Sequence, residues 1–176
     1  MNHDMGSTGA VLGMLAMGLL TSVVAPLLVL AGRRRGAPGP GRRPGLAVGI
    51  LLGFAVLHTA VVLAPSTGAA AAVALHAVLL AGGVVFWLPV LGHGAARLPE
   101  AGRSVYLFLA CPLLDMAALA LVVRGDEPAG VAMIVGMLPI ALAAVVLTWR
   151  WIAGEERAAH VTDAAGVRTA PSGRVS

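Results

Sequence analysis

The sequence predicts an all-α membrane protein, a polytopic bundle of five transmembrane helices with its N-terminus outside the cytoplasm and its C-terminus inside. Three observations lead to this fold class. The chain has 176 residues, of which 59% are hydrophobic and only 11% charged, and its mean hydropathy is +0.91. The apolar residues gather in five long runs, and the arginines gather on one side of those runs. A soluble domain of this length could not bury so much apolar surface, whereas a bilayer can surround it.

Each of the five runs is long enough to cross about 30 Å of hydrocarbon, which takes roughly 20 helical residues. They cover residues 10–31, 46–64, 69–91, 104–123 and 129–149, and only the fourth contains a formal charge, Asp115. Helices are expected because each backbone polar group must be satisfied within its own segment. We therefore expect one transmembrane domain over residues 1–153. A cytoplasmic tail over residues 154–176 should follow, mostly disordered after a short helical extension.

The arginines predict the orientation. Eleven of the twelve lie in loops or tail segments that share one side of the five runs, and only Arg124 lies on the other. The positive-inside rule makes the arginine-rich side cytoplasmic. Aromatic residues near the same span ends, Trp87, Tyr106, Trp149 and Trp151, favour an interfacial belt there. The lack of lysine and the abundance of Ala, Gly and Val are typical of a GC-rich genome, so we expect a multi-pass protein of a bacterial inner (plasma) membrane.

The basic balance of the chain, a formal charge of +4, does not indicate nucleic-acid binding. The arginines lie beside apolar runs, where topology explains them, so the expected partner is the lipid bilayer and not nucleic acid. Cys111 is the only cysteine, which excludes an intrachain disulfide. The sequence contains no nucleophile triad, phosphate-binding loop or paired carboxylate, and we do not expect an enzyme.

Potential soft-metal ligands form a layer in the outer half of the bundle when the outer ends of the spans are placed in register. The candidate ligands are His58, His76, Met14, Met17 and Met133, and Asp115 lies at a similar depth. Imidazole and thioether are copper ligands, and thioether favours Cu(I). An acid inside a membrane is costly and marks function, so Asp115 is expected to orient a histidine or to relay protons. The structural alternative is that the methionines fill gaps and the histidines hydrogen-bond neighbouring helices, while Asp115 pairs with a backbone group or a histidine as a structural lock.

Several short motifs occur in order over most of residues 10–157. They are Ala25-Pro26-Leu27-Leu28 in the first run, His76 with Phe86-Trp87-x-Pro89 in the third, Asp126-Glu127-Pro128-Ala129-Gly130-x-x-Met133 entering the fifth, and Arg150-Trp151 with Glu155-Glu156-Arg157 after it. In this series the chain resembles the CtaG-like cytochrome c oxidase assembly factors, as a short and divergent member. The resemblance implies a multi-span helical bundle that handles copper at the outer face during biogenesis of a haem-copper respiratory oxidase. It also implies respiratory oxidase subunits or other copper-handling proteins as partners.

The chain departs from that family in its first span and in its length. The family has a His-x-x-x-His pair in its early helix and one or two more spans, whereas the corresponding positions here hold Met14 and Gly18. Either the scaffold has lost full metal competence, or methionines have replaced histidine ligands. Two other functions stay open: a proton- or ion-conducting transporter or channel subunit that uses Asp115, and a metal-free structural partner subunit. The histidines of a structural subunit would face lipid or lie too far apart to share a metal.

Overall fold

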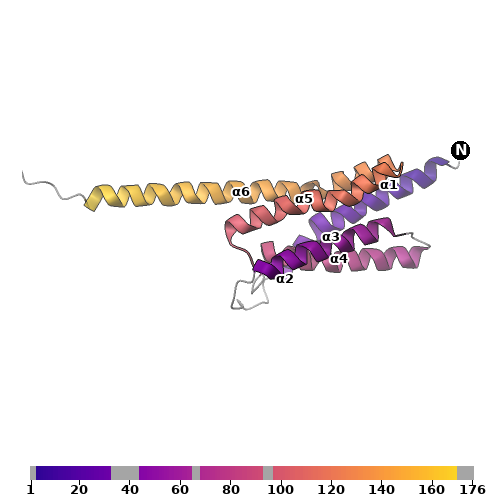
Figure 1. Cartoon of the computed structure of the whole chain (residues 1–176), viewed down its shortest axis with the longest axis horizontal. Helices are drawn as coiled ribbons and strands as arrows, with labels where there is room; N and C mark the ends of the chain where they lie inside the picture. Colours follow the sequence, from indigo (N-terminus) through magenta and orange to yellow (C-terminus); the bar gives the residue numbers. More distant parts are fainter. Residues whose placement is uncertain (1–2, 33–43, 65–67, 93–96, 170–176) are drawn as a thin grey trace, which may run out of the picture.

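The computed structural model describes the backbone of residues 3–32, 44–64, 68–92 and 97–169, with side chains for all of these except 3–7, 44 and 161–169. Every regular element in these ranges is a helix, and five helices are long and apolar enough to cross a membrane (Figure 1). This confirms an all-α bundle with five candidate membrane spans.

The helices follow the five predicted runs closely. The first span consists of α1 (His3–Leu19), a π-helical turn η1 (Leu20–Val24) and α2 (Ala25–Gly32); it is followed by α3 (Pro44–Leu63), α4 (Ala69–Leu91), α5 (Glu100–Val123) and α6 (Glu127–Thr169). α6 packs most extensively against α5 and α1. The tight turn between α5 and α6 depends on Gly125, whose φ of 91° favours glycine.

α6 is longer than the sequence prediction, because it has 43 residues and continues to Thr169. It projects beyond the other helices at one end of the bundle (Figure 1). The prediction of a mostly disordered tail is wrong for residues 154–169, and residues 170–176 lie outside the described residues. The extension contains no proline and is rich in Ala, Glu and Arg, which favour helix. Two contacts four residues apart support it: Trp151 Nε1 donates to Glu155 Oε1 at 3.2 Å, and Arg157 Nε donates to the Ala153 carbonyl at 2.8 Å.

Pro26 explains the π-helical turn in the first span. The N–H of Ala25 bonds to the carbonyl five residues before it, and Pro26 has no N–H to offer. The carbonyl of Thr21 therefore has no helical donor, because the N–H four residues later, that of Ala25, is used elsewhere and the residue five later, Pro26, has none. Trp87 of α4 replaces them, because its Nε1 donates to the Thr21 carbonyl at 2.8 Å. A defect in one span is thus satisfied by a side chain from another, as is common for proline in membrane helices.

Small residues let α1 and α6 approach closely. A Cβ atom on Gly18 would lie 2.8 Å from the Cα of Gly136, and one on Gly136 would lie 2.9 Å from the Leu15 carbonyl oxygen. One turn further on, Ser22 Oγ donates to the Gly136 carbonyl at 2.6 Å. We call Leu15, Gly18, Ser22 and Gly136 the glycine seam. Close backbone contact through small residues is the usual way that membrane helices associate.

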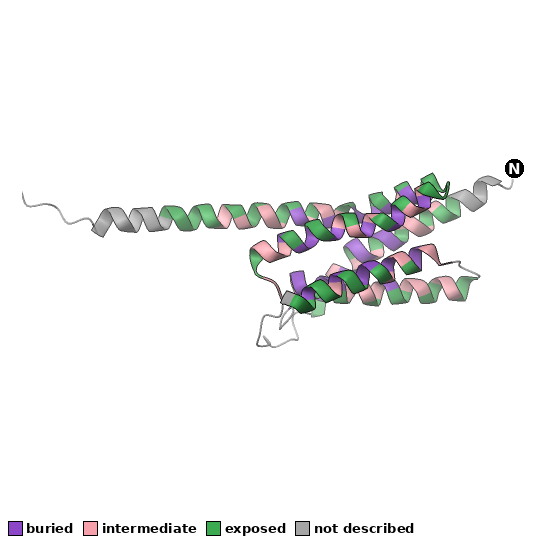
Figure 2. Ribbon diagram, in the orientation of Figure 1, coloured by how far each residue is buried: buried purple, intermediate pink, exposed green. Residues whose placement is uncertain are grey.

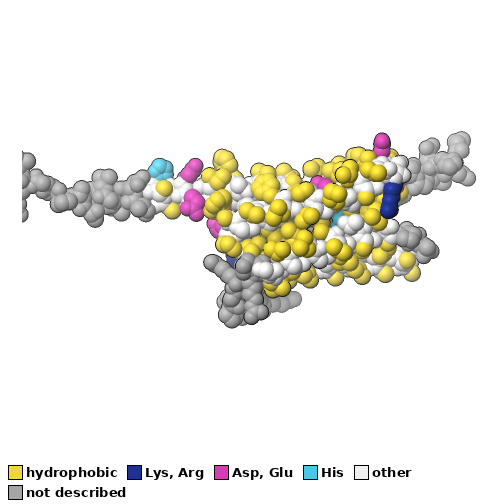
Figure 3. Space-filling view, in the orientation of Figure 1, with side chains coloured by type: hydrophobic (Ala, Val, Ile, Leu, Met, Phe, Trp, Pro, Cys, Tyr) yellow, Lys and Arg dark blue, Asp and Glu magenta, His cyan; other side chains and the backbone are white. Residues whose placement is uncertain are grey.

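The outward faces of the spans are apolar. Hydrophobic side chains cover the body of the bundle in Figure 3, and exposed residues line the outer side of each helix in Figure 2. Large apolar side chains such as Val56, 71% exposed, and Val73, 69% exposed, point out of the bundle. Only 17–39% of the most apolar window of each span is buried inside the bundle. Lipid contact accounts for this surface, and the chain is a multi-pass membrane protein.

An aromatic cluster joins α3, α4 and α5 in the interior. The ring centroids of Phe54 and Phe86 are 4.9 Å apart, and those of Phe86 and Tyr106 are 5.4 Å apart. Tyr106 Oη also donates to the Phe86 carbonyl at 2.9 Å. The expectation of an interfacial belt is therefore wrong for Trp87 and Tyr106, which are only 2% and 4% exposed, and it fits Trp149, which is 73% exposed. Both buried residues donate a hydrogen bond from their polar group to a backbone carbonyl, which allows the aromatic ring to lie in the core.

Candidate functional site

A cavity of about 420 Å³ lies where the first span begins, the second ends and the third begins. Three side chains with ligand atoms line it: Met14 and Met17 from α1, and His76 from α4. Glycine, alanine, valine and leucine form the rest of its wall. We call this space the methionine cavity. It brings together three of the five metal ligands that the sequence predicts.

The ring of His76 is held in one tautomer. Its Nδ1 lies 2.6 Å from the carbonyl oxygen of Ala72, one turn earlier on α4. A carbonyl only accepts hydrogen bonds, so Nδ1 donates this bond, and in the neutral imidazole the lone pair is then on Nε2. Metal-binding histidines are commonly oriented in this way by a carbonyl bonded to their other nitrogen. His76 is thus prepared to offer Nε2 to a ligand in the methionine cavity.

The two methionines share a helix face because they are three residues apart. Met17 is buried, at 8% exposed, and Met14 is half-buried. No group of three or more His, Cys, Asp or Glu side chains suited to a metal occurs among the described residues. The donors of the methionine cavity are instead two thioethers and one imidazole. Thioether and imidazole both bind metals as uncharged ligands, and this set suits a soft monovalent ion such as Cu(I).

His58 lies outside the lining of the methionine cavity. Its side chain is fully buried, with its ring centroid 5.9 Å from that of Phe54, beside the aromatic cluster. Neither ring nitrogen has a hydrogen-bond partner among the described residues. Leaving a buried polar group unpaired costs about 1–3 kcal/mol. The structure therefore does not join His58 to His76 around one cavity, although depth in the membrane suggested that it would.

Met133 also lies elsewhere. It is 1% exposed in the core of the bundle, and its carbonyl oxygen would be 3.2 Å from a Cβ atom on Gly18. It therefore belongs to the contact between α1 and α6 and does not line the methionine cavity. Similar depth on two helices does not place two side chains on facing surfaces, which is why the sequence grouped Met133 with Met14 and Met17.

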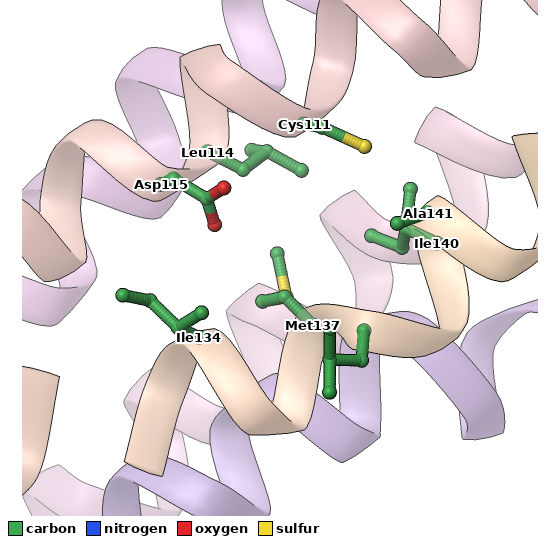
Figure 4. Close-up of a pocket in the computed structure, with 8 residues that line it drawn as sticks. Cys111, Leu114, Asp115, Ile134, Met137, Ile140 and Ala141 are labelled. Carbon is green, nitrogen blue, oxygen red and sulfur yellow. The ribbon is translucent and has the colours of Figure 1, made fainter. Parts of the chain in front are cut away.

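Asp115 borders a separate, small cavity of about 50 Å³ between α5 and α6 (Figure 4). Its carboxylate points towards the side chain of Met137, and Cys111 lies on the same side of the gap, one turn earlier (Figure 4). It does not orient either histidine, because His76 Nδ1 bonds to a backbone carbonyl and both nitrogens of His58 lack hydrogen-bond partners. A half-buried acid in a membrane span is nevertheless a costly feature that marks function.

The glycine seam limits which residues fit at position 18 of the first span. Gly18 has no side chain, and this allows its contact with Gly136. A histidine at this position would collide with the backbone of α6. Met14, one turn earlier, faces the methionine cavity and is free to carry a ligand atom. The pairing of small residues on two spans was the sequence signal for this contact, and it was not recognised.

Comparisons of the chain with models of protein families, with curated proteins and with solved structures find no match. Within the chain, the contact between Trp87 and Thr21 was also not predicted, although it joins the Phe-Trp-x-Pro motif to the turn of helix before the Ala-Pro-Leu-Leu motif. The missing N–H of Pro26 was the signal that could have revealed it. The candidate site is therefore defined by its geometry, which is two thioethers and one oriented imidazole around a single cavity.

Proposed function

We propose that this protein handles Cu(I) in the membrane, with Met14, Met17 and His76 as the ligands. The observation that carries the proposal is their convergence on one cavity from two helices that are far apart in sequence. Copper is the cargo here and has no catalytic role. Following the resemblance to oxidase assembly factors, the receiving protein would be a haem-copper respiratory oxidase or another copper carrier.

The chemistry of the ligands supports transport of Cu(I) more than permanent storage. Thioether sulfur needs no deprotonation, and imidazole binds in its neutral form. A site built from them adds no negative charge, so one bound Cu(I) leaves a single positive charge to be stabilised. Binding at such a site should be weaker than at a thiolate site, which suits a protein that must release its cargo. The partly exposed Met14 provides a route for exchange.

Orientation is the second part of the proposal. The methionine cavity lies where α3 ends and α4 begins, and the arginine-rich segments of the sequence join the helices at their other ends. The positive-inside rule puts those arginines in the cytoplasm. The cavity would then open towards the outer face of a bacterial inner membrane, where an oxidase copper centre would receive the ion.

A competition titration tests the ligand assignment. Protein purified in mild detergent under reductant is titrated with Cu(I) against a chelator of known affinity. Replacing Met14 and Met17 together by Leu, or His76 by Ala, should lower the affinity at least about tenfold, the lower end of what loss of a supporting partner costs at a metal site. Leucine keeps volume and apolarity, so folding should be little affected.

Met133→Leu is the matched control, because Met133 has the same side chain but does not line the methionine cavity. It should bind Cu(I) like the parent. If the parent binds no Cu(I), or if the double leucine variant binds as tightly as the parent, the methionine cavity is not a copper site. In the native host, deleting the gene should also lower the copper content of the haem-copper oxidase, and an unchanged content would contradict the assembly role.

A second candidate function is proton or ion conduction through Asp115. Its support is the half-buried carboxylate, for which the described part of the chain shows no hydrogen bond or ion pair, beside the small cavity between α5 and α6. Liposomes containing the protein would then leak protons in response to a membrane potential, and Asp115→Asn would remove the leak. A parent protein with no leak would exclude this function and leave the copper proposal standing.

A further inference from the structure

A second large cavity, of about 410 Å³, lies at the opposite end of the bundle, between the start of α5 and the middle of α6. Its charged lining is strongly one-sided. Four arginines contribute to it, Arg97, Arg103, Arg150 and Arg157, against a single acid, Glu100. We call this space the arginine pocket. The positive-inside rule explains why arginines lie at this end, but it does not explain why four of them surround one cavity.

Local structure fixes two of the arginines before any ligand is considered. The N–H of Leu98 bonds to the Pro89 carbonyl of α4 at 2.9 Å, which anchors the segment that carries Arg97. Arg103, in the first turn of α5, turns back to this segment, since its Nε donates to the Leu98 carbonyl at 2.9 Å. The segment is therefore tied to both α4 and α5, and Arg97 and Arg103 are held beside each other.

The other two arginines come from α6. Arg150 and Arg157 are seven residues apart, which is two helical turns, so they share one face of the helix. Arg157 Nε is held by the Ala153 carbonyl at 2.8 Å, which fixes the direction of its guanidinium. Part of α6 beyond the bundle thus serves as one wall of the pocket. This gives a role to a stretch that the sequence suggested to be mostly disordered.

Arg97 supplies a donor for which the described part of the chain offers no partner. Its Nε is shielded from solvent and forms no hydrogen bond with the described residues. A donor that is shielded from water and makes no hydrogen bond carries a free-energy penalty. This penalty is larger for a cationic group than for a neutral one. Several guanidinium groups around one space are well suited to oxygen anions, because each offers a planar fork of N–H donors that matches phosphate geometry.

The remaining wall of the pocket distinguishes a lipid from a soluble anion. Val90 and Leu91 at the end of α4 and Leu147 of α6 line its membrane side, so apolar surface continues directly into the charged part. Trp151, also in the lining, is of the residue type that prefers the headgroup level of a bilayer. A free phosphate would use the arginines and leave the apolar wall uncovered. A phospholipid would cover both.

We propose that the arginine pocket binds the phosphate group of an anionic phospholipid, with the acyl chains along the partly exposed Leu91 and Leu147. Basic pockets between membrane helices on the cytoplasmic side are known to take such headgroups. The lipid would bridge α5 and α6 at the point where α6 leaves the bundle. It would therefore hold the projecting part of α6 in place. This inference does not depend on the copper proposal.

Native mass spectrometry of the detergent-solubilised protein tests the proposal. The protein is titrated separately with phosphatidylglycerol, cardiolipin and zwitterionic phosphatidylcholine. The anionic lipids should bind more tightly than phosphatidylcholine. Replacing Arg97 and Arg150 together by Gln should weaken anionic lipid binding roughly thirtyfold, since each arginine near an anionic surface contributes about 1 kcal/mol and 1.4 kcal/mol corresponds to a factor of ten.

Arg124→Gln is the matched control, because Arg124 lies at the other end of α5 and does not line the pocket; it should bind lipid like the parent. Arg150→Gln alone serves if the double variant fails to fold, since Arg150 is exposed. Equal binding of anionic and zwitterionic lipid would overturn the proposal, as would an unchanged affinity in both glutamine variants. In a separate arm, inorganic phosphate that displaces the anionic lipid at equal concentration would show a soluble-anion site and overturn the lipid assignment.

Discussion

Replacing Gly18 by Ala should destabilise the bundle by opening the glycine seam. The added Cβ atom would lie 2.8 Å from the Cα and 2.9 Å from the carbonyl carbon of Gly136. Carbon atoms in contact prefer about 3.5–4.0 Å, so α1 and α6 must separate by roughly 0.7 Å or more. The obstructing atoms are backbone, and no side chain can rotate to make room. The hydrogen bond from Ser22 Oγ to the Gly136 carbonyl, now 2.6 Å, would lengthen at the same time.

The expected cost is about 1–3 kcal/mol, the range for overpacking a well-packed interior. For a chain of this size that corresponds to a fall in melting temperature of roughly 2–12 °C. The change is measured by thermal unfolding in mild detergent, with loss of helical circular dichroism as the signal. Gly136→Ala should behave similarly, because its Cβ would lie 2.9 Å from the Leu15 carbonyl oxygen.

Gly13→Ala on the same helix is the control, since a Cβ there meets nothing within 4 Å. It changes the same residue type in the same helix without touching α6. If Gly18→Ala and Gly13→Ala melt at the same temperature, α1 and α6 do not make the close contact described here. The argument that this contact excludes a histidine from position 18 would fail with it.

Two further predictions concern the interior of the bundle and its orientation. Trp87→Phe removes the indole donor that satisfies a backbone carbonyl of the first span, and it should lower the free energy of unfolding by about 1–3 kcal/mol in a thermal melt. Trp149→Phe, at a 73% exposed position, should cost little, and equal effects of the two changes would show that the buried hydrogen bond does not matter. Reporter fusions after Gly41 and Ala159 should report the cytoplasm and a fusion after Ser66 the outside, as the eleven-to-one arginine asymmetry predicts, and a reversed pattern would refute the orientation.

The spans were predictable from sequence because each depends on a local property. A run of about 20 apolar residues has few alternatives in a bilayer, and the predicted third span, 69–91, coincides with α4 (Ala69–Leu91). The end of α6 was not predicted because polarity, small residues and the lack of helical periodicity were together taken to indicate disorder. Ala, Glu and Arg favour helix without any apolar periodicity, and no proline interrupts them before Pro171.

The candidate site was predicted only in part, because depth along a helix is easier to infer than the direction of a side chain. Met14, Met17 and His76 lie at one end of the bundle and also face one cavity. Met133 has a similar depth but is buried in the core and does not line the cavity, and His58 packs beside the aromatic cluster. Those directions follow from how the helices pack. That packing depends on Gly18 and other small residues, whose partners a single sequence does not identify.

The role of the arginines was likewise underestimated. Topology accounts for their side of the membrane, but it gives no information on which of them converge. Arg97 and Arg103 meet because a backbone hydrogen bond ties the segment before α5 to Pro89. Arg150 and Arg157 join them only because α6 continues as a helix past its membrane span. The pocket thus depends on two features that appear only once the chain is folded.

The most direct test of the central claim is the copper K-edge X-ray absorption spectrum of the protein loaded with one equivalent of Cu(I). The account predicts sulfur and nitrogen neighbours together, from the thioethers of Met14 and Met17 and the imidazole of His76. In the variant with both methionines replaced by leucine the sulfur contribution should disappear, and in Cys111→Ser it should persist. A parent spectrum with only nitrogen or oxygen neighbours, or a sulfur signal that is lost in Cys111→Ser, would contradict a copper site in the methionine cavity.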